Sequence, residues 1–261
     1  MLCFDTETTG LDIADDEIIQ LTITDTSNSY SPVYNNFFAP LNKTSFDGAS
    51  QVTGLYYDQP VPMYPDGPLL CDYPPIGDPD VFDEIQSLLY STGDLMGYHV
   101  AYDAKMMEAA GFDMSGFTYY DPMYAFAIFY WITNPDEQYT TKNGKVRSPW
   151  LDWIHQYVNR NLTFAAGYFD ISFGAHDSSE DVRATIELYH RLCEVEDEIF
   201  GARYAAYDDN DEPILDAYGD QAYESEYNGE RFLLLYPDGT PVTEFIQAFD
   251  LASLYERDRS R

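Results

Sequence analysis

The stretch FDTETTGL, residues 4–11, directly follows the apolar start of the chain and contains two acids, Asp5 and Glu7. In an extended strand, residues two positions apart point to the same face, so both carboxylates are expected to face one site. Gly10 then permits a sharp turn. Two carboxylates at the end of a strand can share a metal ion. The plainer alternative is a polar strand end followed by a turn.

Apolar patterns extend an α/β picture outward from this stretch. They predict strands over residues 1–5, 18–25, 34–38, 95–97 and 117–120. They predict helices over residues 49–55, 81–90, 101–110, 123–132, 150–160 and 180–196. This order indicates an α/β layered domain over residues 1–197, built on a mixed sheet. Residues 198–261 are expected to form a small acidic C-terminal appendage, with a hairpin in FLLLYPDGTPVTEF, residues 232–245.

Other features of the sequence limit where the protein works. No run approaches the ~20 apolar residues that span a bilayer, and the N-terminus lacks the pattern of a secretory signal. Cys3, Cys71 and Cys193 lie far apart, which argues against a disulfide framework or a zinc cluster. We therefore expect a soluble, cytoplasmic protein with no membrane partner.

Three motifs of the sequence resemble, in order, those of the DnaQ-like (DEDDh) 3′-to-5′ exonucleases. FDTETTGL, followed by DEIIQLTITD, is similar to the first motif of that family. GYHVAYDAKMM, residues 97–107, supplies Asp103 for the second, although the family usually has His-Asn where this chain has Tyr98-His99. GAHDSSEDVRAT, residues 174–185, supplies His176 and Asp181 for the third. The histidine is the most specific match, because the chain has only four histidines.

The resemblance implies a ribonuclease H-like mixed β-sheet flanked by helices and a metal-dependent exonuclease. Such an enzyme releases nucleoside 5′-monophosphates from single-stranded DNA or short oligonucleotides. The implied cofactors are two divalent cations, Mg²⁺ or Mn²⁺, which would also offset the repulsion among four converging carboxylates.

The resemblance also implies a role for individual residues. Asp5, Glu7 and Asp181 would bind the first ion, Asp5 would bridge to the second, and Asp103 would hold the second through water. His176 would be the general base, since an imidazole exchanges protons near neutral pH. The implied substrate-binding residues are Thr8, Thr9, Gly10, Leu11, His99 and Gly54, the last from the segment GASQVTGL.

Some residues of these motifs also have a structural alternative. Asp103 on its own fits an acid favoured by the dipole in a first helical turn. Ser178 or Ser179 can cap the long helix, and Ser178 with Asp181 can form a capping box. His155 and His190 are expected to be structural or exposed.

Two further groups of residues bear on substrate binding. The aromatic stripe of Phe126, Phe129 and Tyr130 is expected in the core, although an aromatic ring near the site can stack on a base. The most concentrated group of cations is Lys142, Lys145 and Arg147. These three are candidates for phosphate contacts, and a solvated loop is the alternative.

The charge of the chain argues against a nuclease. There are 46 acidic residues against 13 Lys and Arg, a formal net charge of -33, and such a surface repels polyanions at long range. Three explanations stay open: the substrate is short, a partner such as a polymerase or clamp delivers the strand, or the protein works in high salt. The rival hypothesis is a non-catalytic exonuclease-like binding protein or an acidic nucleic-acid mimic. The choice between DNA and RNA also stays open.

Overall fold

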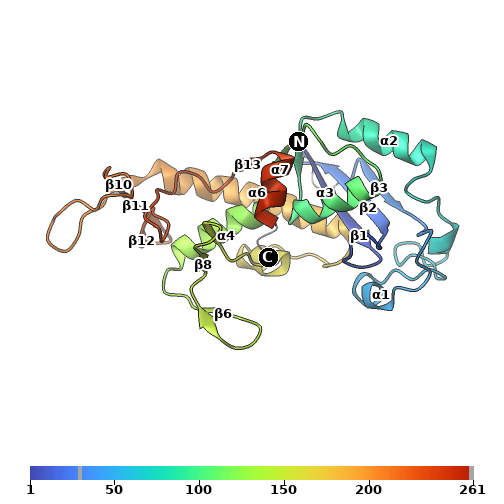
Figure 1. Cartoon of the computed structure of the whole chain (residues 1–261), viewed down its shortest axis with the longest axis horizontal. Coiled ribbons are helices and arrows are strands. Elements are labelled where there is room, and N and C mark those ends of the chain that lie inside the picture. The colour runs from blue at the N-terminus through green and yellow to red at the C-terminus, as the bar shows by residue number, and fades with distance from the viewer. Residues whose placement is uncertain (29–30, 259–261) are drawn as a thin grey trace.

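A six-stranded mixed sheet forms the centre of the computed structural model, which describes residues 1–28 and 31–258 (Figure 1). Its strand order is β13-β5-β4-β1-β2-β3, in which β1, β4 and β5 are parallel neighbours and the other pairs are antiparallel. The strands are β1 (Leu2–Thr8), β2 (Ile18–Asp25), β3 (Tyr34–Phe37), β4 (Asp94–Met96), β5 (Thr118–Tyr120) and β13 (Ala248–Phe249). The predicted mixed sheet is confirmed.

Helices flank this sheet and continue beyond its edge. They are α1 (Asp47–Thr53), α2 (Pro79–Leu89), α3 (Val100–Ala109), α4 (Pro122–Thr133), α5 (Leu162–Tyr168), α6 (Ser178–Gly201) and α7 (Leu251–Asp258), with a short 3₁₀ helix at Leu70–Asp72. Among the described residues, none of these helices is long and apolar enough to cross a membrane. Asp177, rather than either predicted serine, caps α6, and its carboxylate accepts from the Ser179 N–H.

The alternation of side chains along β1 assigns each face of the sheet to a helix. Phe4 is buried with Val100 and Ala104 of α3. Cys3 faces the other way and packs against Val182 of α6. Because alternate residues share a face, the odd-numbered residues of β1 point toward α6 and the even-numbered ones toward α3. This division decides where the acids of the first motif point.

A second core forms around α4, beyond the edge of the sheet. Phe126, Phe129 and Tyr130 are buried there, which confirms the predicted core position of this stripe. Figure 1 shows α6 running from the sheet to a small separate sheet. That sheet consists of β10 (Arg203–Ala205), β11 (Tyr223–Tyr227) and β12 (Glu230–Leu233).

The helix predicted over residues 150–160 is wrong. The chain instead forms the hairpin of β8 (Trp150–Leu151) and β9 (Gln156–Tyr157), preceded by the hairpin of β6 (Tyr139–Thr140) and β7 (Val146–Arg147). Trp150 and Tyr157 pair across the strands, with ring centroids 5.0 Å apart, and both are buried. Burial of this aromatic pair outweighs the helical spacing of the segment.

The C-terminal residues divide between the two sheets. The regular hairpin there is β11–β12, which turns at Asn228-Gly229, whereas the predicted Pro-Asp-Gly turn closes only the bridge between Leu235 and Pro241. The chain then returns to the main sheet, where β13 pairs with β5 and Leu254 of α7 joins the main core. A functional division at residue 197 stays a prediction.

Candidate functional site

Three acids from two elements meet at one end of the sheet. Asp5 and Glu7 project from the α6 face of β1, and Asp181 lies in the first turn of α6. One carboxylate oxygen from each lies within 4.8 Å of the others. We call these three residues the carboxylate triad. The sequence resemblance implied the same set for the first metal ion, and the structure brings the set together.

The triad is electrostatically costly without a cation. Burial and the neighbouring acids raise the pKa of Asp5 well above its usual range. Burial, followed by the charge of Asp181, raises the pKa of Glu7 to about 8, and burial raises the pKa of Asp181 to about 7. These shifts mark a site that resists negative charge unless something positive binds there. Carboxylate oxygens suit hard divalent ions such as Mg²⁺ and Mn²⁺, so the residues fit the implied cofactors.

Asp103 approaches the same strand from α3. Its Oδ1 accepts hydrogen bonds from the Thr6 N–H at 3.0 Å and the Thr6 hydroxyl at 2.6 Å. Thr6 points toward α3, so this acid lies next to the triad without belonging to it. Burial raises the pKa of Asp103 to about 6, against the opposing effects of the Thr6 hydroxyl and His99. Thr6, which fixes this carboxylate, was not among the predicted site residues.

His176 lies on the turn that leads into α6. Its backbone has a left-handed φ of 69°, and its N–H donates to Asp181 Oδ2 at 3.0 Å. Asp181 therefore organises this turn instead of forming the predicted capping box with Ser178. The His176 side chain is exposed, and its ring makes none of the hydrogen bonds found among residues 1–28 and 31–258. Its proposed role as a base therefore stays a prediction.

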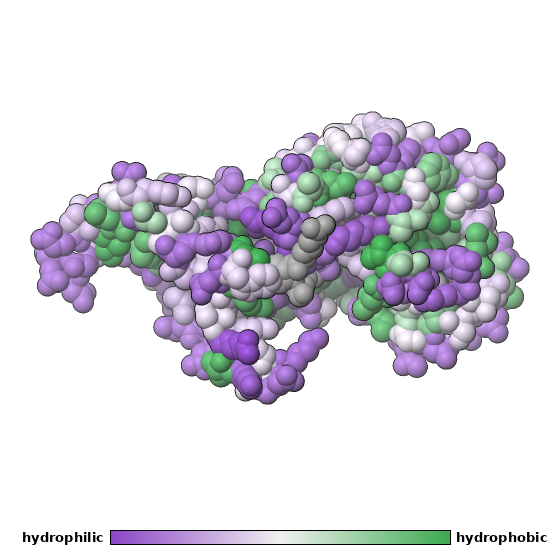
Figure 2. Space-filling view, in the orientation of Figure 1, coloured by the Kyte–Doolittle hydropathy of each residue, from purple (hydrophilic) through white to green (hydrophobic). Residues whose placement is uncertain are grey.

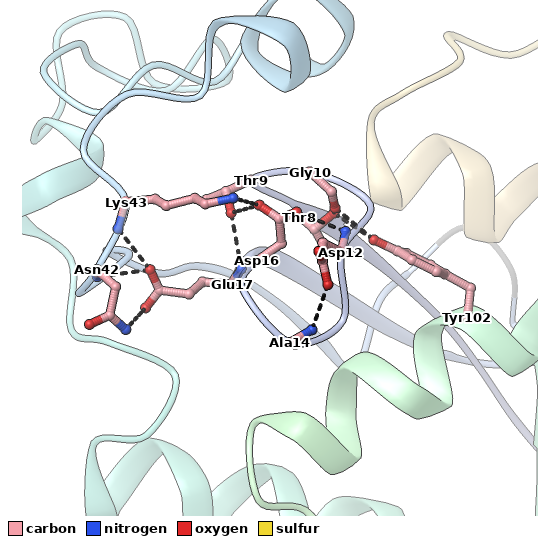
Figure 3. Close-up of polar contacts among 10 residues, drawn as sticks. All are labelled: Thr8, Thr9, Gly10, Asp12, Ala14, Asp16, Glu17, Asn42, Lys43 and Tyr102. Carbon is pink, nitrogen blue, oxygen red and sulfur yellow. Dashed lines mark hydrogen bonds and ion pairs between the residues drawn. The ribbon is translucent and has the colours of Figure 1, made fainter.

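The loop after β1 holds the predicted substrate-binding residues in a fixed shape (Figure 3). Tyr102 reaches from α3 and donates to the Gly10 carbonyl at 2.8 Å, and the Thr8 hydroxyl donates to the same carbonyl at 2.6 Å. Leu11, directly after this anchor, is 85% exposed. The loop that follows the acids of β1 thus presents an exposed apolar side chain. Tyr102, which the sequence analysis missed, is the anchor.

Two acids fasten the other end of the loop (Figure 3). Asp16 accepts from the Thr9 hydroxyl at 2.8 Å and pairs with Lys43. A Cβ at Gly10 would lie 2.5 Å from Asp16 Oδ2, so a larger residue would push the Asp16 carboxylate away from the Thr9 hydroxyl and Lys43. Glu17 accepts from the backbone N–H groups of residues 41, 42 and 43. Glycine is therefore favoured at position 10 by this close packing and not by the backbone conformation, because the φ of Gly10 lies outside the left-handed region.

The two remaining predicted substrate residues have structural roles. His99 precedes α3 with φ 66°, and its Nε2 lies 2.7 Å from Asp258 Oδ1. Gly54 ends α1 with φ 74°, and its N–H donates to the Ser50 carbonyl. Of the other histidines, His155 is exposed at a turn and pairs with Asp238, and His190 is exposed on α6.

Comparisons with known proteins find likeness in structure only. No family model matches the sequence, and no curated protein matches it either. The structure is similar to that of E. coli exonuclease I in complex with a dT13 oligonucleotide, with a TM-score of 0.50 and 12% identity over 97% of this chain and 64% of that one.

Two other similar structures have lower scores. Exonuclease I from Methylocaldum szegediense has a TM-score of 0.46 and 19% identity over 74% of this chain and 40% of that one. A 3′-exonuclease that recognises the 3′ end of a histone mRNA stem-loop has a TM-score of 0.45 and 11% identity over 94% of this chain and 96% of that one.

The chain spans between 40% and 64% of the length of these two exonuclease I chains. The likeness covers the mixed sheet and its helices, the same elements that carry the triad. The chain therefore has the ribonuclease H-like fold of the DnaQ-like exonucleases.

Proposed function

We propose that the protein is a metal-dependent 3′-to-5′ exonuclease that acts on single-stranded nucleic acid. The observation that carries this proposal is the triad, whose three carboxylates lie within 4.8 Å on the fold of exonucleases. A buried acidic cluster of this kind costs stability at neutral pH. Divalent cations bound among the carboxylates would offset this cost.

Each residue has a task in the proposed reaction. Asp5, Glu7 and Asp181 hold a divalent cation, and Asp103, fixed by Thr6, adds a fourth carboxylate beside them. Bound divalent ions would supply positive charge against the phosphate and promote ionisation of the attacking water. Leu11 on its anchored loop packs against the terminal nucleotide.

His176 completes the proposal as the group that accepts a proton from the attacking water. Its exposed ring sits on the turn that Asp181 organises through the backbone. A polar residue held in the left-handed region at such a turn is a frequent feature of functional sites. The products are nucleoside 5′-monophosphates. Digestion of a DNA and an RNA oligonucleotide side by side shows which strand is the substrate.

A direct test is the digestion of 5′-labelled oligo(dT) and oligo(rU) with Mn²⁺. We expect a ladder of stepwise shortened products from the wild type and none from Asp5→Asn. His176→Ala should lower kcat by a factor of 10²–10⁴, typical for loss of a general base. His190→Ala, which removes an exposed histidine elsewhere on α6, is the matched control and should retain full activity. Equal activity in the wild type and Asp5→Asn would contradict the proposal.

The rival function is a non-catalytic binding protein on the same fold. The net charge of -33 favours it, since the chain resembles a polyanion. Titration calorimetry with Mn²⁺ separates the two. An enzyme should bind the ion in the wild type and lose that binding in Asp5→Asn, whereas no heat of binding in either protein would favour the rival.

A further inference from the structure

A cleft of about 760 Å³ lies between the start of α3 and the two hairpins β6–β7 and β8–β9. Among the described residues that line it, none is Asp or Glu, while Lys142, Arg147 and Arg160 are present. Acids make up 46 of the 261 residues, so a lining of this size would contain about three by chance. The cleft is therefore a local exception to the negative surface of the molecule, much of which is hydrophilic on the face seen in Figure 2. We call it the basic cleft.

Two of its cations are available to a ligand. Lys142 and Arg147 are exposed, and neither forms an ion pair among residues 1–28 and 31–258. Arg160 differs, because it pairs with Glu137 at 3.0 Å and lies over aromatic rings. Lys145 is exposed on the same hairpin but does not line the cleft. The β6–β7 hairpin, which carries Lys142, Lys145 and Arg147, projects away from α4 in Figure 1.

The wall of the cleft also contains polar atoms without partners. Gln156 is 7% exposed, and its Oε1 has no hydrogen-bond partner among the described residues, nor has Oδ1 of Asn159. An unpaired buried polar group costs about 1–3 kcal/mol, so such groups call for an explanation. Tyr98 and Tyr139 are half-buried in the same wall. Positive charge, amide groups and aromatic rings together suit a ligand that has both phosphates and bases.

A chain of contacts through the start of α3 connects the basic cleft to the loop after β1. The Tyr98 hydroxyl donates to the Arg160 carbonyl at 2.8 Å, which joins the cleft wall to the start of α3. His99 lines the cleft and stacks with Tyr102 at a centroid distance of 6.2 Å. Tyr102 in turn anchors the loop at Gly10. A strand whose end lies at the loop is thus within reach of the cleft.

We propose that the basic cleft binds the single-stranded nucleic acid behind its 3′-terminal nucleotide. Lys142 and Arg147 contact phosphates, while Tyr98, Tyr139 and the free amide groups contact bases. This inference rests on the proposed exonuclease function for its direction along the strand. It also gives a polyanion a favourable place to bind on an acidic protein.

Binding of labelled oligo(dT) and oligo(rU), with Ca²⁺ replacing Mg²⁺ to slow hydrolysis, tests the proposal. The double variant Lys142→Gln, Arg147→Gln should weaken binding about 10- to 30-fold at 0.1 M salt, because a single-strand phosphate contact contributes a salt slope of ~0.7. The slope of log affinity against log salt should fall by ~1.4 for the same reason. Lys145→Gln is the matched control and should change affinity less than about 2-fold. A nitrophenyl ester of thymidine 5′-monophosphate is too short to reach the cleft, so its kcat/KM should be unchanged in all variants.

Three outcomes would overturn the inference. These are no binding by the wild type, a double variant that behaves like Lys145→Gln, or equally tight binding of poly(Glu), which would indicate an acidic protein segment as the ligand. The proposed enzyme activity fails separately. If nucleic acid binds through Lys142 and Arg147 but no products form, the cleft inference stands and the exonuclease proposal does not.

Discussion

Burial and the charge of Asp181 raise the pKa of Glu7 to about 8, whereas an unfolded glutamate titrates near ~4.3. The folded protein therefore holds this proton more tightly than the unfolded chain. Without metal, the protein therefore loses stability as pH rises from the unfolded pKa of ~4.3 to the folded pKa, and the loss is complete above pH ~8. At pH ~8, metal-free Glu7→Gln should be more stable than the wild type by on the order of 5 kcal/mol, with little difference near pH ~4.

Divalent cations should make the wild type more stable than Glu7→Gln at pH ~8, the reverse of the order without metal. An ion that binds only the folded wild type adds stability in proportion to the logarithm of its concentration over Kd, and Glu7→Gln loses this gain. Urea unfolding with EDTA and with Mg²⁺, at both pH values, measures the effect. Glu198→Gln, on the exposed side of α6, is the control and should follow the wild type. Identical pH profiles for the wild type and Glu7→Gln would show that the triad is not under electrostatic strain.

Among the elements, the loop after β1 depends on one hydroxyl from α3. Tyr102→Phe removes the donor to the Gly10 carbonyl, a hydrogen bond worth about 1 kcal/mol, and frees the loop that carries Leu11. Burial raises the pKa of Tyr102 to about 12, so the donor is present throughout an ordinary assay range. We expect the KM for oligonucleotides to rise about 5-fold with a smaller change in kcat. Tyr218→Phe, at a side chain that is 73% exposed, should change neither, and a loop without a positioning role would leave both variants alike.

The position of α7 depends on an ion pair with α3. Asp258 accepts from Lys105 and lies 2.7 Å from His99 Nε2, and these partners hold the pKa of its carboxyl well below the usual range. A lowered pKa stabilises the fold above the unfolded value of ~3.9, and this contribution is lost as pH falls through the folded pKa. Asp258→Asn should therefore cost about 1–3 kcal/mol at neutral pH and progressively less in acid. Thermal unfolding against pH, with Asp209→Asn in an exposed segment as the control, measures this; a constant difference at every pH would exclude the ion pair as its source.

Helices and strands differ in how well the sequence predicts them. β2 falls on residues 18–25 as expected, because six of its eight residues are apolar or β-branched and no competing pattern is present. The segment 150–160 misleads, since Trp150, Ile154 and Tyr157 fit a helical period although Trp150 and Tyr157 pair across a hairpin. β13 has only two residues, and its pairing with β5 is a contact of long sequence separation that leaves no local signal.

The candidate site divides in a similar way. Asp5 and Glu7 were predictable because a period of two places them on one face, and motif order indicated Asp181. The partners that fix the site were not, since Thr6 and Tyr102 act through contacts across 97 and 92 positions of the chain. Single hydroxyl groups of this kind have no sequence signature. Of the residues that line the basic cleft, the sequence indicated Lys142, Arg147 and His99 as candidate substrate contacts, whereas Arg160 and Gln156 join them only through folding.

For the whole molecule, the net charge of -33 and the basic cleft should act on binding in opposite ways. Remote charges repel an approaching strand strongly in 0.01 M salt, where the screening length is ~30 Å. The repulsion is much weaker in 0.15 M salt, where the screening length is ~8 Å. The association rate should therefore rise as salt increases over this range, opposite to the fall expected for a basic nucleic-acid-binding protein. The dissociation rate should rise as well, because salt competes with the short-range contacts of Lys142 and Arg147. Stopped-flow measurement of both rates separates the two effects: in the double cleft variant, the salt dependence of association should persist while that of dissociation weakens. An association rate that falls with salt would mean that the strand meets the cleft without crossing the negative field of the molecule.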